Sequence, residues 1–329
     1  MLVYLDQSAL SRLAEGRFPD LLETLRRGIH SGALLCPESF EHRDETVLAD
    51  KSRFDAITEL SDELSMGVGL LDREDVWRNE VHVAVASFLG EEPPMEIWKE
   101  AFEKDPHLPL DHLFPVSPGL RVTFPPEKVD WREEEARKRK EPFADLLNEH
   151  WQRSTGASFE EQTEVEFQGS LGLLLMPLVN PSRFLAWLKE SRALMEEEIR
   201  AGHIESDYNR YVHRHELGEF SDFLLCTYPT LRNRLGEFLA SRQLRCTPSL
   251  RYPALLFAAL FCTLCRKVRE SDVFDIQHLT QGLSRCDIVT ADGAWVQWCR
   301  ERNLVPGSVR LFSSRELDQL TAHLHSVLN

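Results

Sequence analysis

Residues 2–10 read LVYLDQSAL, and this stretch decides the fold of the protein. The apolar run Leu2–Leu5 is rich in strand formers and fits a strand buried on both faces, as in a parallel sheet. Asp6 follows the run directly, and residues 8–15 have the pattern of a short helix that ends at Gly16. The chain therefore begins as a strand followed by a helix, with an acid at their junction.

The alternation of strands and helices continues from this stretch and returns at the other end of the chain. Helices are predicted at residues 19–29 and 39–65, with a short buried strand at 33–36. The C-terminal part is predicted to contain strands at 286–290 and 309–312 and helices at 273–283, 293–303 and 314–328. We therefore expect an α/β fold with a doubly wound parallel sheet, assembled from the N- and C-terminal segments through right-handed crossovers.

A large, mostly α-helical insertion is predicted between the two segments. Residues 1–65 and 250–329 would form a discontinuous α/β domain, and residues 66–249 would form the insertion. Apolar residues at three- and four-residue spacing predict helices at 72–88, 126–153, 159–176, 181–201 and 206–240. The proline-rich residues 106–126 predict a long irregular loop or hinge within the insertion.

The composition excludes some functional classes. The chain has 329 residues with 38 Lys and Arg against 54 Asp and Glu, so its formal net charge is −16. A generally cationic nucleic-acid binder is excluded, because binding to phosphates requires a cationic surface. The longest apolar run, residues 253–265, is too short to span a membrane. The start of the chain lacks a secretory signal and the seven cysteines are scattered, so we expect a cytoplasmic protein without membrane contact.

Four carboxylates lie where a doubly wound sheet would bring them together. Asp6 follows the first strand, and Asp292 ends the strand motif CDIVTAD at residues 286–292. Glu45 and Asp275 belong to helices whose first turns are expected to face the same edge of the sheet. Carboxylates gathered at one place would repel one another unless they bound a divalent cation. Carboxylates suit Mg²⁺ or Mn²⁺, so the sequence predicts a metal site at this edge.

These motifs resemble those of the PIN-domain nuclease superfamily, specifically its PIN-like branch with a large internal insertion. The resemblance covers residues 1–55 and 266–329 and rests on LVYLDQSAL (2–10), SFEHRDE (39–45), DVFDIQHL (272–279) and CDIVTAD (286–292). It implies a metal-dependent endonuclease, most often acting on RNA, that hydrolyses phosphodiester bonds with one or two Mg²⁺ or Mn²⁺ ions. The residues that would hold the ions are Asp6, Glu45, Asp275 and Asp292.

Further residues would support this site. Asp287 is expected as an auxiliary metal ligand, provided that its strand begins there. Ser8, Ser39 and Thr290 would orient the carboxylates through hydrogen bonds, and His42 and His278 would bond neighbouring carboxylates or position a phosphate or a water. Asp272 has another interpretation, because it could cap the helix at 273–283 with Asp275 as its capping-box partner.

A basic cluster in the insertion offers a weak nucleic-acid site. Arg137, Lys138, Arg139 and Lys140 follow the acidic residues 133–135. They fit an exposed helix with Glu-to-Lys or Glu-to-Arg pairs, and they also fit a phosphate-binding edge of the insertion.

Two alternatives to a ribonuclease remain open. Residues 56–265 carry 23 Lys and Arg against 36 Asp and Glu, so most of the negative charge lies on the insertion. A catalytically inactive PIN-like module could bind a basic protein partner there. Flap-type DNA nucleases use similar carboxylate clusters, so the substrate could also be DNA instead of RNA.

Overall fold

A computed structural model describes residues 1–46, 49, 51–71, 73–93, 102–103, 145, 147–153, 156–200, 206–263 and 268–328. The basic cluster predicted at Arg137–Lys140 lies outside these residues, as does the proline-rich stretch 106–126. The chain forms two compact units. The first contains Met1–Arg73, Glu100–Phe159 and Leu255–Asn329, and the second contains Glu74–Lys99 and Glu160–Ala254.

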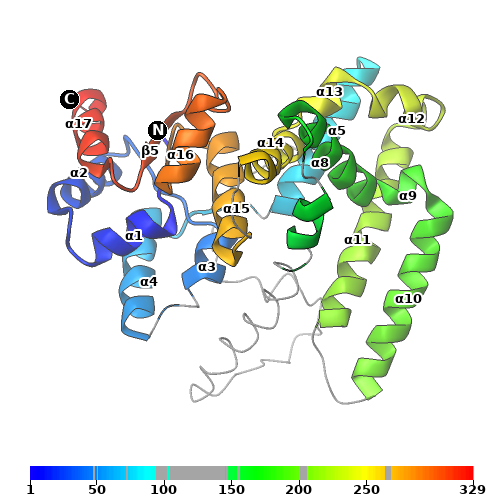
Figure 1. The fold of residues 1–329 in the computed structure, drawn as a ribbon, viewed down its shortest axis with the longest axis horizontal. Coiled ribbons are helices and arrows are strands. Elements are labelled where there is room, and N and C mark those ends of the chain that lie inside the picture. Colours follow the sequence, from blue (N-terminus) through cyan, green and yellow to red (C-terminus); the bar gives the residue numbers. More distant parts are fainter. Residues whose placement is uncertain are drawn as a thin grey trace. The chain divides into compact units, whose positions relative to one another are not determined.

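The first unit has an α/β architecture built from both ends of the chain. Its parallel sheet has the strand order β1 (Val3–Tyr4), β4 (Ile288–Ala291) and β5 (Arg310–Ser313). In the register of this sheet Val3 lies opposite Ile288, and Ile288 lies opposite Arg310. Figure 1 shows the N-terminal elements in blue beside the C-terminal elements in orange and red. The prediction of an α/β class, with strands from both ends of the chain in one parallel sheet, is confirmed.

Helices from both ends of the chain accompany this sheet in the first unit. They are α1 (Gln7–Ala14), α2 (Pro19–His30), α3 (Phe40–Thr46), α4 (Lys51–Ser65), α15 (Glu270–Arg285), α16 (Gly293–Glu301) and α17 (Leu317–Leu328). Apolar residues of β1, α1, α2, α4, β4 and α17 form one buried core. A short antiparallel ribbon joins β2 (Gly69–Leu70) to β3 (Phe102–Glu103).

The helix α15 lies very close to the sheet because of a glycine. A Cβ atom on Gly282 would stand 2.7 Å from Cγ1 of Val289 and 3.2 Å from Cδ1 of Tyr4. Any larger residue would push the helix away from β1 and β4. Gly282 thereby sets the position of the earlier turns of α15, which contain Asp275 and His278.

Three predicted elements differ from the structure for local reasons. The strand expected at 33–36 is a single parallel bridge between Leu2 and Leu35, because Pro37 has no N–H with which to extend the ladder. The helix expected at 39–65 is divided into α3 and α4, and the Thr46 carbonyl accepts the N–H of Ala49, which ends α3. The helix expected at 206–240 is likewise divided, at Pro229.

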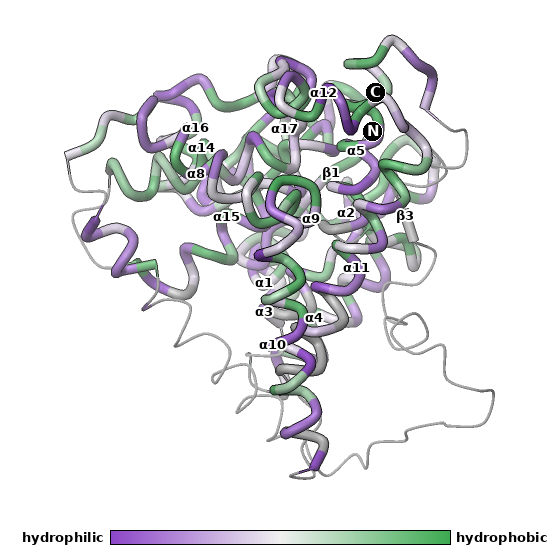
Figure 2. Tube along the Cα trace, turned by 90° about the vertical axis from the view of Figure 1, so that its right-hand side faces the viewer, coloured by the Kyte–Doolittle hydropathy of each residue, from purple (hydrophilic) through white to green (hydrophobic). Residues whose placement is uncertain are grey.

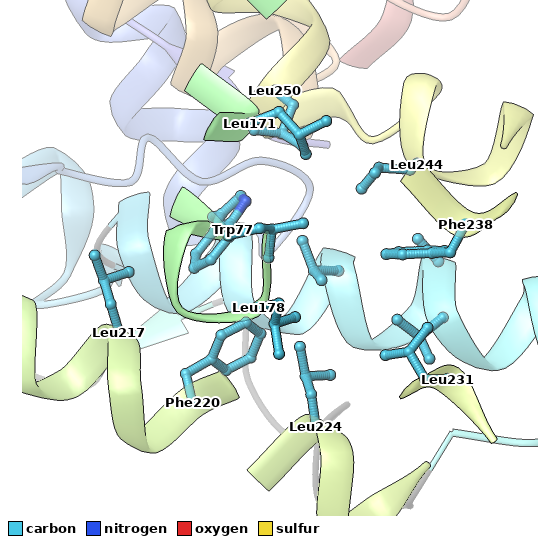
Figure 3. Close-up of a cluster of buried hydrophobic side chains, with 14 of the residues drawn as sticks. Trp77, Leu171, Leu178, Leu217, Phe220, Leu224, Leu231, Phe238, Leu244 and Leu250 are labelled. Atoms are coloured by element: carbon cyan, nitrogen blue, oxygen red, sulfur yellow. The ribbon is translucent and has the colours of Figure 1, made fainter. Parts of the chain in front are cut away.

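The second unit is helical in the part that the structure describes. Its helices are α5 (Arg73–Leu89), α8 (Phe159–Leu174), α9 (Met176–Val179), α10 (Pro181–Arg200), α11 (Ser206–Thr227), α12 (Leu231–Leu239) and α13 (Arg242–Arg245), while α14 (Pro248–Thr263) contributes to both units. Figure 3 shows the core of this unit, in which Trp77, Phe220 and Phe238 pack among leucines. Hydrophilic and hydrophobic residues both occur along α10 in Figure 2, as in an amphipathic surface helix. Among the described helices, none combines the length and the apolar character that crossing a membrane requires.

Candidate functional site

A cleft of about 290 Å³ lies in the first unit, beyond the carboxyl ends of β1 and β4. Strand ends at such an edge are where ligands bind in open α/β sheets. The residues predicted for the site that line this cleft are Asp6, Ser8, Glu45, Asp275, His278 and Asp292. The fold therefore places the four predicted acids on one surface, although they come from four different parts of the chain.

Asp6 and Asp292 are each fixed at the start of a helix. Asp6 is the N-cap of α1, and its Oδ1 accepts the backbone N–H of Ala9 at 3.2 Å. Asp292 is the N-cap of α16, and its Oδ1 accepts the backbone N–H of Ala294 at 2.9 Å. Both positions stabilise the ionised carboxylate, because a helix N-terminus favours negative charge. These capping roles were missed in the sequence, although an acid directly before a helix is the usual N-cap signal.

Thr290 joins Asp6 to the neighbouring strand. Its hydroxyl donates to Oδ1 of Asp6 at 2.6 Å, and the backbone N–H of Asp6 donates to the Thr290 Oγ1 at 2.7 Å. Asp6 is only 6% exposed. Burial raises the pKa of Asp6 above its ordinary value, and the hydrogen bond from Thr290 opposes this rise. Asp6 is therefore rigidly held and partly deprived of water.

Glu45 is held by a histidine from another helix. It lies in the last turn of α3, which is much shorter than the helix predicted at 39–65. Its Oε2 accepts a hydrogen bond from Nε2 of His278, a buried residue of α15, at 3.1 Å. Burial lowers the pKa of His278. The hydrogen bond and charge of Glu45, together with the charges of Glu41 and Asp6, raise this pKa by more than burial lowers it. The net result is a pKa above the ordinary value, which strengthens the bond to the carboxylate.

Asp275 lies in the electrostatic field of the other three acids. Burial is the main cause that raises its pKa to about 8, followed by the charges of Glu45, Asp292 and Asp6. Its Oδ2 accepts the indole N–H of Trp295 at 3.1 Å. The four acids thus form one electrostatic group in which one member prefers to keep its proton at neutral pH.

The alternative interpretation of Asp275 as a capping residue is wrong. The helix α15 begins at Glu270, and Asp272 occupies the third helical position instead of the cap. There Oδ2 of Asp272 accepts the backbone N–H of Arg269 at 2.6 Å. Asp275 consequently lies in the second turn of α15, beyond the reach of the first unpaired N–H groups.

Each of the four acids is anchored through one carboxylate oxygen. Asp6 and Asp292 use Oδ1, Glu45 uses Oε2 and Asp275 uses Oδ2. The second oxygen of each accepts no hydrogen bond from the residues that the structure describes. These hard oxygens suit Mg²⁺ or Mn²⁺ chemically. As they stand, no three His, Cys, Asp or Glu side chains of the described chain are close enough to enclose one ion. Side-chain rotation toward the cleft would therefore have to accompany cation binding.

A buried chain of hydrogen bonds begins at His278, the residue that holds Glu45. Nδ1 of His278 is 2.7 Å from the hydroxyl of Tyr4, which is 2.8 Å from the hydroxyl of Ser39. Ser39 in turn contacts Nδ1 of His42 through its hydroxyl at 3.0 Å and its backbone N–H at 3.1 Å. Nε2 of His42 donates to the carbonyl of Leu5 at 2.6 Å. The chain thus connects Glu45 to the residue that directly precedes Asp6.

The protonation of His42 follows from its contacts. Burial, and then the nearby His278, lower the pKa of His42 to about 3, so its ring is neutral. Because the Ser39 N–H donates to Nδ1, the proton of the ring lies on Nε2 and is donated to the Leu5 carbonyl. His42 therefore bonds to the Leu5 carbonyl and to Ser39, and the Ser39 hydroxyl also bonds the Tyr4 hydroxyl. The predicted contact of Ser39 with a carboxylate is wrong. Tyr4 was missed because a tyrosine in a buried strand has only the pattern of a core residue.

Removing the Tyr4 hydroxyl is expected to destabilise the protein. Tyr4→Phe removes one buried hydrogen-bond partner from Nδ1 of His278 and one from the Ser39 hydroxyl, which costs about 1–3 kcal/mol of unfolding free energy. Tyr228→Phe is the matched control, because the Tyr228 hydroxyl is buried and has no hydrogen-bond partner in the described chain. We expect this control to be neutral or slightly stabilising. Thermal and urea unfolding monitored by circular dichroism would measure both. Equal losses in the two variants would contradict the role of the Tyr4 hydrogen bonds.

Asp287 does not belong to the site. It precedes β4, and its Oδ2 accepts the backbone N–H of Leu2 at 2.8 Å. It therefore lies at the amino end of the strand whose carboxyl end carries Asp292. The expectation of an auxiliary metal ligand is wrong because β4 begins only after Asp287, at Ile288.

The cleft also contains aromatic and cationic residues that the sequence patterns did not single out. Trp295, Trp298 and Arg269 line it together with the acids. The two tryptophans are three residues apart on α16 and therefore share a helix face, but this signal alone is also typical of core packing.

No protein-family model matches the chain, and neither a curated protein nor a solved structure matches it.

Proposed function

We propose that this protein is a PIN-like, Mg²⁺- or Mn²⁺-dependent nuclease that hydrolyses phosphodiester bonds, with RNA as its substrate. The observation that carries the proposal is the group of four acids that line one cleft. In each acid one carboxylate oxygen is held by a hydrogen bond, and the second oxygen remains available to a cation. The resemblance of the motifs around Asp6, Glu45, Asp275 and Asp292 to the PIN-domain superfamily supports the same assignment.

The charge of the acidic group favours a cation. Asp275 has a pKa of about 8 because its ionised form is buried beside three other acids. A divalent cation held by these acids would offset their mutual repulsion. Once bound, it would polarise a water molecule and neutralise the charge that develops on the phosphoryl oxygens.

The chain itself supplies groups that favour a phosphate. The N-terminal ends of three helices line the cleft, α1 through Ser8, α15 through Ser271 and α16 through Ala294. Helix N-termini attract anions, so they offset part of the repulsion between a phosphate and the acids. The exposed Arg269 adds a full positive charge to the same surface. These groups would orient the phosphodiester, and the buried contacts of Thr290 and His278 would keep Asp6 and Glu45 in place.

Cation binding and cleavage test the proposal together. Mn²⁺ binding would be followed by calorimetry, and labelled single-stranded RNA, structured RNA and DNA would be incubated with the protein in Mg²⁺ or Mn²⁺, with and without a chelator. We expect Mn²⁺ to bind and RNA to be cleaved only in the absence of the chelator. Cleavage that survives the chelator would exclude the metal mechanism. Absence of both binding and cleavage would favour the interaction module, and cleavage of DNA alone would reassign the polymer.

A further inference from the structure

An aromatic pair stands beside the acids of the cleft. Trp295 and Trp298 of α16 pack edge to face, with ring centroids 4.9 Å apart and an interplanar angle of 74°. Trp295 is buried and donates its indole N–H to Asp275. Trp298 is partly exposed, and both rings line the cleft. The pair is thus connected directly to one of the proposed metal ligands.

The two tryptophans differ in what the fold requires of them. Trp295 fills the core and fixes Asp275, so its role is structural. Trp298 leaves part of its indole ring open to a cleft that otherwise contains mostly polar and charged side chains. The exposed part of this ring offers an apolar surface that a flat ligand could cover and so remove from water. None of the carboxylate contacts described above uses Trp298.

The chemistry of the cleft matches three parts of one ligand. The acids suit a metal-bound phosphate, Arg269 suits a neighbouring phosphate, and the open indole suits a flat aromatic group. A nucleotide strand carries all three groups at adjacent positions. A base paired within a duplex would not be free to stack on a protein side chain, whereas an unpaired base is.

We propose that Trp298 is a stacking site for an unpaired nucleobase, so that the cleft accepts single-stranded nucleic acid in preference to a duplex. This inference rests on the proposed nuclease function and adds the substrate class and one residue that selects it. The stacked base lies next to the phosphate held at the acids. Trp295 supports Trp298 from the core side, and Asp275 connects both to the site of the reaction.

Binding to normal and abasic strands tests this role. The full-length protein would be titrated into labelled oligonucleotides, one with bases and one composed of abasic nucleotides, and anisotropy would report the affinity. Ca²⁺ would replace Mg²⁺ so that the strand binds without being cleaved. Ca²⁺ binds the same oxygen ligands but does not impose the octahedral geometry of Mg²⁺. The variants are Trp298→Ala and Trp298→Phe. Gln297→Ala is the control, since Gln297 is an exposed neighbour on α16 that bonds Glu301.

The expected result is a loss that depends on the bases. Trp298→Ala should weaken binding of the normal strand about tenfold or more, which corresponds to about 1.4 kcal/mol or more, and Trp298→Phe should weaken it less. Neither variant should change binding of the abasic strand by more than about twofold, because the partner of the ring is missing there. Gln297→Ala should bind both strands as the wild type does. A matched duplex should bind more weakly than the single strand.

Several outcomes would overturn the inference. An unchanged affinity of Trp298→Ala, or an equal loss for normal and abasic strands, would exclude base stacking, as would no binding of the normal strand by the wild type. Thermal unfolding of each variant would distinguish a folding defect from a loss of base stacking. If Trp298→Ala does not fold, Trp298→Phe still tests the inference, because it keeps an aromatic ring. Metal-dependent cleavage by the wild type with normal affinity in Trp298→Ala would refute only this inference. Base-dependent binding without cation binding or cleavage would refute only the nuclease.

Discussion

Replacing Asp292 with Asn is expected to reduce Mn²⁺-dependent cleavage about 100-fold or more, because the substitution removes one negative oxygen ligand. Asn keeps an oxygen that can accept the N–H of Ala294, so the N-cap of α16 is preserved. The loss would therefore reflect the missing charge and not an altered helix. Initial rates on labelled RNA, with Mn²⁺ affinity measured in parallel, would quantify it.

Asp287 supplies the matched control for this experiment. It stands at the opposite end of β4, and Asn can still accept the N–H of Leu2 there. Asp287→Asn makes the same chemical change on the same strand, and we expect activity within about twofold of the wild type. A similar loss in both variants would show that net charge matters more than the cleft. Full activity of Asp292→Asn would remove this acid from the proposed site.

The second large effect concerns stability and pH in the metal-free protein. Asp275 has a pKa of about 8 in the folded state against 3.8 for the ordinary carboxyl. Between these values the folded protein holds a proton that the unfolded chain has released. Its stabilising contribution is complete below about pH 4 and is lost as the pH rises toward 8. Asp275→Asn cannot titrate, and it keeps an oxygen for the N–H of Trp295.

Asp275→Asn should therefore be more stable than the wild type at pH 8 by an amount on the order of a few kcal/mol. Near pH 4 the two proteins should be nearly equal. Urea unfolding in chelator at several pH values would measure the difference. Addition of Mn²⁺ at pH 8 should reverse the order, because the cation stabilises the ionised acid of the wild type. Parallel pH profiles of the two proteins would contradict the environment described for Asp275.

Local sequence patterns predicted those parts of the fold that depend on short-range physical chemistry. The apolar run at 2–5 and the strand formers Ile288, Val289 and Thr290 within 286–290 indicated β1 and β4, because strands buried on both faces are rich in such residues. The acids Asp6 and Asp292 follow these runs, and their meeting at one edge follows from parallel pairing. Predictions failed where a single residue interrupted a longer pattern, as Pro37 did for the strand at 33–36.

The positions of other residues depended on exact boundaries that a pattern does not contain. Asp287 and Asp292 are five residues apart on one strand motif, yet one lies at each end of β4. Asp272 and Asp275 were both compatible with a cap, and only the start of α15 at Glu270 distinguished them. A shift of one to three residues in an element's boundary was enough to change the role of each acid.

The sequence by itself determined an α/β segment at each end of the chain and four acids positioned to meet beyond their strands. Only the tertiary structure decided how those acids are held. The bonds of Tyr4 with His278 and of Thr290 with Asp6 connect residues more than 270 positions apart. The physical reason is that a hydrogen bond requires atoms about 3 Å apart. Distances between the two ends of the chain are set by the packing of α15 on the sheet, which no local pattern specifies.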